Sequence, residues 1–342
     1  MKISVIGGGG WGTALSIVLE SRGHAVRLWV FEADLAEKMR STRLNERFLP
    51  EVRIPDAIQI TTSLPEAAAD AEILLFVTPS HALRATATKL VAEAGESLKR
   101  VQWVTVATKG LETKTLRRMS EVLTETLPKE LGERVVVLAG PSHAEEVARR
   151  VPTLIVAACE SAPLAAKAQE AFSTDWLRIY SNDDVVGVEI GVALKNVIAI
   201  AAGIADGLGF GDSTKAALMT RGLAEISRLG EVLGARRETF AGLAGMGDLI
   251  ATATSRHSRN RRLGEAIGRG ATLKEALASS PMVVEGVGTA EAAVSLALRH
   301  GVELPIVEQV YSILYEGKSA PTALRELLTR DLKAEAGTLS RR

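Results

Sequence analysis

Hydrophobic and polar positions follow two different patterns along the chain, and the change falls near residue 184. Before that point, short apolar runs recur, for example at residues 2–6, 25–30 and 73–77. The run at residues 73–77 is nearly continuous, which is typical of a strand that is buried on both faces of a sheet. The stretches between them repeat apolar residues every three to four positions, as helices do. Strands that alternate with helices predict a parallel sheet with right-handed crossovers.

The same pattern predicts the remaining elements of this half. Further strands are expected at residues 58–61, 101–106, 134–138, 153–158 and 177–180. Helices are expected at residues 13–22, 34–42, 65–70, 82–96 and 115–127. Residues 45–55 contain two prolines and predict a loop.

After residue 184 the pattern contains only helical periods. A long helix is expected at residues 185–202, and Asp184 is placed to cap it. Because this helix replaces a Gly/Ser linker between the halves, we expect a fixed cleft with limited hinge motion. Further helices are expected at residues 213–229, 237–243, 259–267, 272–278, 288–297, 305–314 and 321–329.

A glycine-rich segment follows the first predicted strand directly. Gly7, Gly9 and Gly12 fit the spacing G-x-G-x-x-G. The first permits a tight turn, the second lets a pyrophosphate approach the backbone, and the third lets the helix pack on the strand. The helix N-terminus then offers free N–H groups to the phosphates. The sequence therefore predicts a Rossmann-like, doubly wound α/β domain at residues 1–184 that binds a dinucleotide, followed by an all-α domain at residues 185–342.

Polar or small residues follow three predicted strands, as Thr78-Pro79-Ser80, Thr108-Lys109-Gly110 and Gly140-Pro141-Ser142. In open parallel sheets, ligands bind beyond the carboxyl ends of the strands. We therefore expect these three segments to converge near the glycine loop. Glu32, at the end of the second strand, is spaced to accept hydrogen bonds from a ribose.

Composition narrows the class of protein. The 342 residues include 41 basic and 41 acidic side chains, and this balance argues against a nucleic-acid or anionic-membrane binder. The only cysteine, Cys159, lies in an apolar run, so we expect a core residue and a reducing compartment. The apolar run at residues 187–205 is interrupted by Glu189, Lys195 and Asn196, which argues against membrane insertion. Because the first strand starts at residue 2, we expect no targeting segment and a cytoplasmic protein.

Lys195 is the most unusual residue of the chain. It lies within a predicted helix among Gly191, Val192, Ile198 and Ala199 at three- and four-residue spacing. Desolvation on an apolar face lowers the pKa of a lysine and allows it to act as a base. A buried structural lysine, paired with a carboxylate, fits the same context equally well.

Lys109 follows a predicted strand, where its ammonium could hold an anionic substrate or polarise a hydroxyl. A lysine in a surface turn is the simpler interpretation. Asp248 is a candidate partner for Lys195, and Arg259 offers a planar fork that matches phosphate. Ser258 could instead cap a helix with solvated arginines beside it. The five histidines show no metal-ligand spacing, and only His143 lies near a predicted site segment.

At this point the residues match a known family. The chain resembles NAD(P)-dependent glycerol-3-phosphate dehydrogenases over nearly its full length. The matching stretches are residues 7–15, Val77-Thr78-Pro79-Ser80-His81, residues 107–112, Gly140-Pro141-Ser142, residues 194–199, Gly245-Met246-Gly247-Asp248-Leu249, Ser258-Arg259-Asn260-Arg261-Arg262 and Val283-Val284-Glu285-Gly286. The first stretch is shared with many Rossmann enzymes, whereas the others, in this order, are specific.

The resemblance implies interconversion of sn-glycerol 3-phosphate and dihydroxyacetone phosphate, which supplies glycerophospholipid synthesis. It also implies a homodimer. The lysine that matches Lys195 is the proton acceptor in that family. The positions that contact the substrate match Lys109, Gly140, Ser142, Lys195, Asp248, Ser258, Arg259 and Asn260. Those that contact NAD or NADP match Gly7, Gly9, Gly10, Trp11, Gly12, Phe31, Lys109, Ala144, Arg259, Val283 and Glu285.

Three other interpretations remain open at this stage. Another hydroxy-acid dehydrogenase would also use a helix lysine, but it would not need Ser258, Arg259 and Asn260. A cofactor-sensing regulatory protein would not need both Lys195 and Asp248. A nucleic-acid binder would have only one short basic cluster, at residues 256–262. For the cofactor we expect use of both NADH and NADPH with a preference for NADH, because Glu32 and Asp34 would repel a 2′-phosphate.

Overall fold

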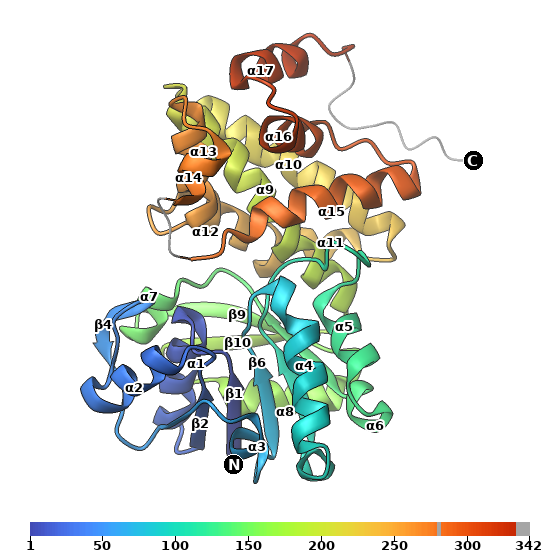
Figure 1. Ribbon diagram of the computed structural model, residues 1–342. Helices are drawn as coiled ribbons and strands as arrows, with labels where there is room; N and C mark the ends of the chain where they lie inside the picture. Colours follow the sequence, from blue (N-terminus) through green and yellow to red (C-terminus); the bar gives the residue numbers. More distant parts are fainter. Residues whose placement is uncertain (279–281, 333–342) are drawn as a thin grey trace.

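The chain forms two lobes stacked on one another (Figure 1). The computed structural model describes residues 1–278 and 282–332. One lobe contains an eight-stranded sheet covered by helices, and we call it the sheet lobe. The other, the helical lobe, begins with a long helix at Val185. An α/β domain of Rossmann type followed by a helical domain is therefore confirmed as the fold class.

Strand order places the glycine segment near the middle of the sheet. Across the sheet the strands are β10 (Leu177–Asn182), β9 (Thr153–Ala158), β8 (Val135–Ala139), β7 (Trp103–Val106), β6 (Ile73–Phe76), β1 (Lys2–Ile6), β2 (Ala25–Trp29) and β5 (Gln59–Thr61). The chain turns from β1 towards β2 on one side and later towards β6 on the other. This reversal makes a topological switch point at the end of β1, where such sheets bind ligands.

Alternate residues of each strand supply two separate cores. Ile3 and Val5 belong to one cluster, whereas Ile6 belongs to the other, as the two-residue period of a strand requires. The first face is covered by α1 (Gly10–Ser21), α2 (Ala33–Thr42), α7 (Ala144–Ala148) and α8 (Ala162–Phe172). The second face is covered by α3 (Leu64–Ala68), α4 (Ser80–Ala94), α5 (Met119–Thr126) and α6 (Lys129–Gly132). Cys159 lies in the first core and is 5% exposed.

Three sequence expectations about this lobe were wrong. The sheet is not wholly parallel, because β9 pairs with β8 in the antiparallel direction. The connection between them contains only the five-residue helix α7, about 7 Å long, which is too short to carry the chain back along the sheet. Residues 45–55 are not a plain loop, since β3 (Leu44–Asn45) pairs with β4 (Leu49–Arg53).

The third error concerns the helix expected at residues 115–127, which begins only at Met119. Residues 111–118 instead form a closed turn in which Leu111 bridges Arg118 and Leu116 has a φ of 62°. Arg118 is the N-cap of α5, and its N–H donates to the Glu121 carboxylate at 2.9 Å. The helix-like spacing of apolar residues begins before Met119, but the N-cap at Arg118 sets the start of the helix, so residues 115–118 lie outside it.

The helical lobe is built around α9 (Val185–Gly207). The cap expected from Asp184 is confirmed, because the Asp184 carboxylate accepts from the N–H of Gly187 at 2.8 Å. The helices that follow are α10 (Asp212–Val232), α11 (Arg237–Phe240), α12 (Asp248–Thr254), α13 (Arg259–Gly268), α14 (Leu273–Ala278), α15 (Glu285–His300), α16 (Pro305–Tyr315) and α17 (Ala320–Leu328). Helix α9 is long and apolar enough to cross a membrane, but 94% of its most apolar window is buried inside the protein. It is therefore the core helix of this lobe.

The backbones of helices α13 and α9 pack directly against each other at glycine positions. A Cβ atom added to Gly264 would lie 2.1 Å from the carbonyl oxygen of Ile200. One added to Gly203 would lie 2.0 Å from that of Arg261. These approaches leave no room for a side chain at either position. The two glycines thus fix the start of α13, with Arg259 and Asn260, relative to Lys195 on α9.

Candidate active site

Three strand ends meet at the glycine segment, as expected. The hydroxyl of Thr108 donates to the carbonyl of Thr78 at 2.7 Å, and the ammonium of Lys109 donates to that of Gly140 at 2.9 Å. The glycine turn itself is tightly packed, because a Cβ on Gly12 would lie 1.9 Å from the carbonyl oxygen of Gly7. Gly7 has a φ of 133°, which a residue with a side chain rarely adopts.

One buried carboxylate holds two lysines at the boundary between the lobes. Asp248 begins α12, and its side chain is 2% exposed. The ammonium of Lys195 donates to its Oδ1 at 2.8 Å, and that of Lys109 donates to its Oδ2 at 2.9 Å. The predicted pairing of Asp248 with Lys195 is confirmed. Lys109 is not a lysine of a solvated turn, because it lies half-buried and spans the two lobes.

Burial and charge set the protonation of this group. Desolvation, together with the charges of Lys109 and Arg259, lowers the pKa of Lys195 to about 8, against the opposing effect of Asp248. Burial acts to raise the pKa of Asp248, but the two ammonium groups outweigh it and hold that pKa below its usual value. A lysine with a pKa near 8 can exist in either protonation state at physiological pH. Such a residue is suited to general acid–base catalysis.

His143, on the sheet lobe, faces the same two lysines. Burial lowers its pKa, and the charges of Lys195 and Lys109 add to this effect. Its Nε2 lies 3.4 Å from the carbonyl oxygen of Ala251, on α12. The imidazole is therefore neutral at physiological pH and adds no further positive charge beside Lys195.

The start of α13 faces Lys195 from the helical lobe. Ser258 caps this helix by accepting from the N–H of Arg261 at 3.2 Å, and its hydroxyl proton remains available as a donor. The guanidinium of Arg259 donates to the carbonyl of Val283 at 2.7 Å. Burial lowers the pKa of Arg259 from its ordinary value, although Glu285 opposes this. A guanidinium beside a helix N-terminus is a favourable site for a phosphate.

Asn260 differs from its neighbours because its side chain is already engaged within the protein. It donates to Oδ1 of Asn196 at 2.9 Å and accepts from the N–H of Gly286 at 2.9 Å. It therefore joins α13, α9 and α15. One of its two amide N–H groups remains for a substrate oxygen.

Several of the residues expected around the cofactor lie near the glycine segment and the neighbouring strand ends. A Cβ on Gly9 would meet no described atom within 4 Å, so the backbone there is open to a phosphate. A Cβ on Gly10 would lie 3.6 Å from that of Ala144, which places both residues together. Phe31 lies two residues after the end of β2 and is 76% exposed, as a ring that stacks on adenine requires. Glu285 reaches from α15 to the N–H of Ser80 at 3.1 Å and also accepts from the Ser80 hydroxyl.

Two buried donors near the glycine segment support this fit. Within the described part of the chain, Trp11 Nε1 and Thr78 Oγ1 are buried and have no hydrogen-bond partner. Buried polar groups are rarely left unpaired in a folded protein. Both residues belong to segments that meet at the switch point, so a dinucleotide that binds there would supply acceptors.

Sequence reasoning missed the contacts of four residues that take part in this arrangement. Thr252 accepts a hydrogen bond from Lys195, and Asn196 holds Asn260. Position gives a signal for both, because Thr252 lies one turn after Asp248 and Asn196 lies next to Lys195. Ser80 was expected near the glycine segment as part of a strand end, but its contact with Glu285 was not. Arg47 gave no signal in the sequence. Arg47 lies 3.1 Å from Asp34 and 4.0 Å from Glu32 only because residues 44–53 fold back as a hairpin.

A glycine segment at the switch point of a doubly wound sheet, with a desolvated lysine facing it from a helical lobe, defines a two-domain nicotinamide-dependent dehydrogenase. Residues 2–165 match the family model for the N-terminus of NAD-dependent glycerol-3-phosphate dehydrogenase, and residues 184–325 match that for its C-terminus. The chain belongs to this family. It is an NAD(P)-dependent oxidoreductase that interconverts sn-glycerol 3-phosphate and dihydroxyacetone phosphate by hydride transfer.

Known relatives are similar over nearly the whole chain. It is 52% identical over 335 residues to an NAD(P)+ glycerol-3-phosphate dehydrogenase from Thermoanaerobacter sp., covering 98% of this chain and 99% of that one. The enzyme of the same name from Citrifermentans bemidjiense is 50% identical over 334 residues and 98% of each chain. The crystal structure of a glycerol-3-phosphate dehydrogenase from Coxiella burnetii aligns with a TM-score of 0.90 at 37% identity, covering 96% of this chain and 99% of that one.

Proposed function

We propose that Lys195 is the acid–base residue of this reaction. In the oxidation of glycerol 3-phosphate, its neutral amine accepts the proton of the C2 hydroxyl. In the reverse reaction, its ammonium donates a proton to the ketone oxygen. NAD(P), when bound, supplies or accepts the hydride. The observation that supports this role most directly is the burial of Lys195 with a pKa of about 8, against the Asp248 carboxylate.

The other site residues take roles that follow from their chemistry. Lys109 polarises the C2 oxygen, and Asp248 holds Lys109 and Lys195 together. Arg259 binds the substrate phosphate with Ser258, Asn260 and the start of α13. Ser142 and the backbone of Gly140 bind the substrate from the sheet lobe. Contacts with the cofactor come from Gly7, Gly9, Gly10, Trp11, Gly12, Phe31, Lys109, Ala144, Arg259, Val283 and Glu285.

The proposal extends to the organisation of the chain. The dinucleotide domain comprises residues 1–184, and the substrate domain comprises residues 185–342, of which 279–281 and 333–342 lie outside the described residues. The enzyme works in the cytoplasm as a homodimer and supplies glycerophospholipid synthesis. Light scattering coupled to gel filtration tests the oligomeric state, and a monomer at micromolar concentration would contradict it.

Replacement of Lys195 by alanine tests the central role. General acid–base catalysis contributes roughly 10²–10⁴-fold, so turnover should fall at least by that order. The affinity for NADH, measured by fluorescence titration, should stay near that of the wild type. Near-normal turnover in a folded Lys195→Ala protein would remove Lys195 from the mechanism. Loss of NADH binding as well would indicate a misfolded variant rather than a missing acid–base group.

A further inference from the structure

Glu189 is a buried carboxylate that the roles given above do not use. It lies on α9, six residues before Lys195, and is 4% exposed. Burial raises its pKa, although Arg118 and Ser120 oppose this effect. Such a group is costly to bury unless it is fully hydrogen-bonded, so its partners are informative.

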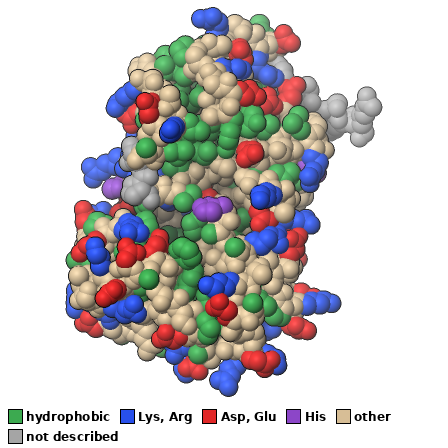
Figure 2. All heavy atoms as spheres, viewed as in Figure 1, with side chains coloured by type: hydrophobic (Ala, Val, Ile, Leu, Met, Phe, Trp, Pro, Cys, Tyr) green, Lys and Arg blue, Asp and Glu red, His purple; other side chains and the backbone are tan. Residues whose placement is uncertain are grey.

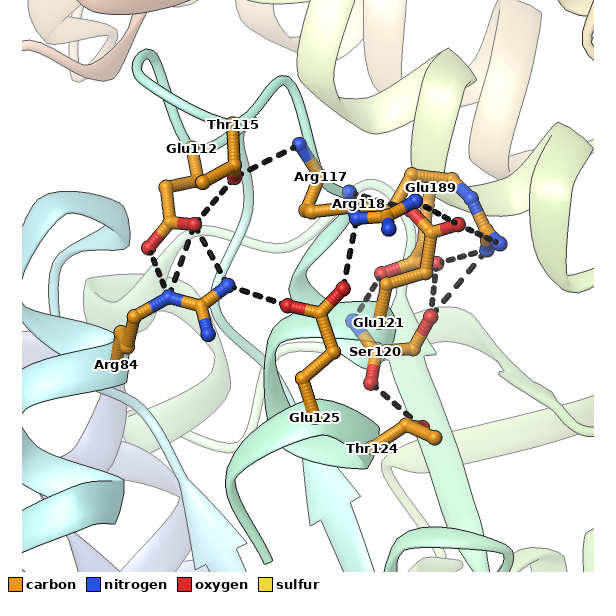
Figure 3. Close-up of polar contacts among 10 residues, drawn as sticks. All are labelled: Arg84, Glu112, Thr115, Arg117, Arg118, Ser120, Glu121, Thr124, Glu125 and Glu189. Carbon is orange, nitrogen blue, oxygen red and sulfur yellow. Dashed lines mark hydrogen bonds and ion pairs between the residues drawn. The ribbon is translucent and has the colours of Figure 1, made fainter.

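Within the described part of the chain, the hydrogen-bond partners of the Glu189 carboxylate all come from the sheet lobe. The Oε2 atom accepts from the guanidinium of Arg118 at 2.6 Å and from the hydroxyl of Ser120 at 2.5 Å. The Oε1 atom accepts from the N–H of Ser120 at 2.8 Å. Figure 3 shows these groups pointing toward one another from α9 and from the start of α5. The contact therefore fixes the N-terminus of α5 onto the helix that carries Lys195.

Arg118 also closes the turn of residues 111–118, which follows Lys109 almost directly. Leu111 bridges Arg118, and the N–H of Glu112 donates to the carbonyl of Arg117 at 2.9 Å. The two ends of the turn are thus held together. Lys109 lies two residues before Leu111, so this turn directly follows the segment that carries the Lys109 ammonium.

The turn is held from its other side by Arg84 on α4. Its guanidinium donates to both oxygens of Glu112, at 2.9 and 2.8 Å, and to Glu125 on α5 at 2.7 Å (Figure 3). These pairs lie within the sheet lobe and are partly exposed. Among the polar contacts drawn in Figure 3, only those of Glu189 join the turn to the helical lobe, and Leu111 and Leu116 of the turn also pack in the apolar core of that lobe.

We propose that Glu189 is a positioning residue of the active site. By holding Arg118 and Ser120, it fixes the turn of residues 111–118 on α9 and so sets the position of the Lys109 ammonium relative to Lys195. One helix then holds both cations of the site, Lys195 through its own side chain and Lys109 through Glu189. This inference rests on the roles proposed above for Lys109 and Lys195.

The conservative variant Glu189→Gln tests it. The carboxylate accepts from three donors, whereas a glutamine has an NH2 group in place of one oxygen. That NH2 would face a donor of Arg118 or Ser120, so the turn should shift. Small misplacements of catalytic groups reduce rates by up to about 10²-fold. We expect kcat/KM for dihydroxyacetone phosphate to fall roughly tenfold to a hundredfold.

The pH profile separates this effect from a loss of stability. The charged and titratable groups that face Lys195 are Asp248, Lys109, Arg259 and His143. If Lys109 moves away, Lys195 loses a neighbouring positive charge and keeps Asp248, so its pKa rises and the kcat/KM profile moves to higher pH. Removal of the Glu189 charge alone would act in the opposite direction. An alkaline shift therefore reports movement of Lys109.

Two controls match the variant. Glu121→Gln removes a charge at the same end of α5, where Glu121 pairs with Arg118 at 3.2 Å, but an amide oxygen can still accept from the Arg118 N–H, and the ion pair and hydrogen bond of Glu121 with Arg118 do not involve α9. Leu123→Ala creates a cavity in the buried side of α5 and matches the expected loss of thermal stability. Both should retain the wild-type pH profile. If Glu189→Gln does not fold, Ser120→Ala removes one of the three donors and should give a smaller shift in the same direction.

A double-mutant cycle decides whether the effect passes through Lys109. In a Lys109→Ala background, Glu189→Gln should change kcat/KM by less than about twofold, because the group that it positions is gone. A wild-type pH profile in Glu189→Gln, an equal shift in Leu123→Ala, or additive effects in the cycle would each overturn the inference. A fully active Lys195→Ala would overturn the proposed roles and this inference together. An inactive Lys195→Ala with a wild-type-like Glu189→Gln would overturn this inference alone.

Discussion

At the scale of single residues, the protonation of Lys195 determines how activity depends on pH. Its pKa lies at about 8, and oxidation requires the neutral amine whereas reduction requires the ammonium. The kcat/KM for glycerol 3-phosphate should therefore rise as the pH increases from 7 to 8 and level off above it. The kcat/KM for dihydroxyacetone phosphate should be level below pH 8 and fall above it.

Initial rates between pH 7 and 10 check this prediction, because the substrate phosphate stays a dianion in that range. The NADH affinity, measured at each pH, controls for effects on the cofactor. If kcat/KM changes with pH in the same way for oxidation and for reduction, a group other than Lys195 limits the rate.

Arg259 should discriminate between phosphorylated and unphosphorylated substrates. A hydrogen bond to a charged group contributes about 1.5–3 kcal/mol, which is roughly a tenfold to hundredfold change in kcat/KM. Arg259→Ala should lose this much with dihydroxyacetone phosphate and little with dihydroxyacetone. Equal losses with the two substrates would mean that Arg259 does not bind the phosphate.

Arg47 changes the expectation for the cofactor. The preference for NADH rests on repulsion of a 2′-phosphate by Glu32 and Asp34, yet Arg47 pairs with both of these carboxylates in space. An arginine there can accommodate a 2′-phosphate. Arg47→Ala should lower kcat/KM for NADPH at least about tenfold more than for NADH, and Glu32→Arg should move the preference toward NADPH. An Arg47→Ala variant with an unchanged cofactor ratio would contradict this assignment.

At the scale of elements, the contact of α13 with α9 should be sensitive to a single methyl group. In Gly264→Ala the new Cβ would lie 2.1 Å from the carbonyl oxygen of Ile200, and backbone cannot yield as a side chain can. We expect a loss of about 1–3 kcal/mol in the free energy of unfolding, together with a higher KM for dihydroxyacetone phosphate. Denaturant unfolding and steady-state kinetics measure both.

A surface variant of the same helix provides the control. Arg269 follows α13, and its side chain is 68% exposed. Arg269→Ala should change the free energy of unfolding by less than about 0.5 kcal/mol and leave KM unaltered. If Gly264→Ala destabilises the protein without raising KM, α13 does not depend on this contact to place Arg259.

Elements with a clear run or periodic spacing of apolar residues were predictable from the sequence, whereas elements defined by tertiary contacts were not. The eight strands of the large sheet and helix α9 follow from apolar runs and from the Asp184 cap. The hairpin of residues 44–53, the turn of residues 111–118 and helix α12 depend on pairings that local sequence does not show. The pairing of Lys195 with Asp248 was predicted from the chemistry of a buried lysine. The ion pair of Lys109 with the same carboxylate was not predicted, because it depends on how the two lobes pack.

At the scale of the whole molecule, polar contacts cross between the lobes at several places. Lys109 meets Asp248, Ser80 meets Glu285, and Arg118 meets Glu189. Buried contacts of this kind resist separation of the lobes, which agrees with the fixed cleft expected from the helical connection. The radius of gyration, measured by small-angle scattering, should therefore change little when NADH saturates the enzyme. A clear decrease would show that the cleft closes on the cofactor.

The outer surface is mixed in charge at the same scale. Figure 2 shows acidic and basic side chains interspersed over both lobes, in agreement with the equal numbers of 41 basic and 41 acidic residues. A negatively charged substrate is therefore attracted by local groups such as Arg259 and Lys109 rather than by the net charge of the protein. Added salt should act mainly through those groups.

Cys159, the only thiol of the chain, is buried in the sheet core, and burial raises its pKa. Thiolates react with maleimides far faster than thiols do, so the native protein should be inert to such reagents. Cysteines introduced at Lys99 and Leu298, whose side chains are largely exposed on different lobes, would then be the only sites that take up dye. The wild-type background is thus already suited to single-molecule energy transfer, without replacement of a native residue.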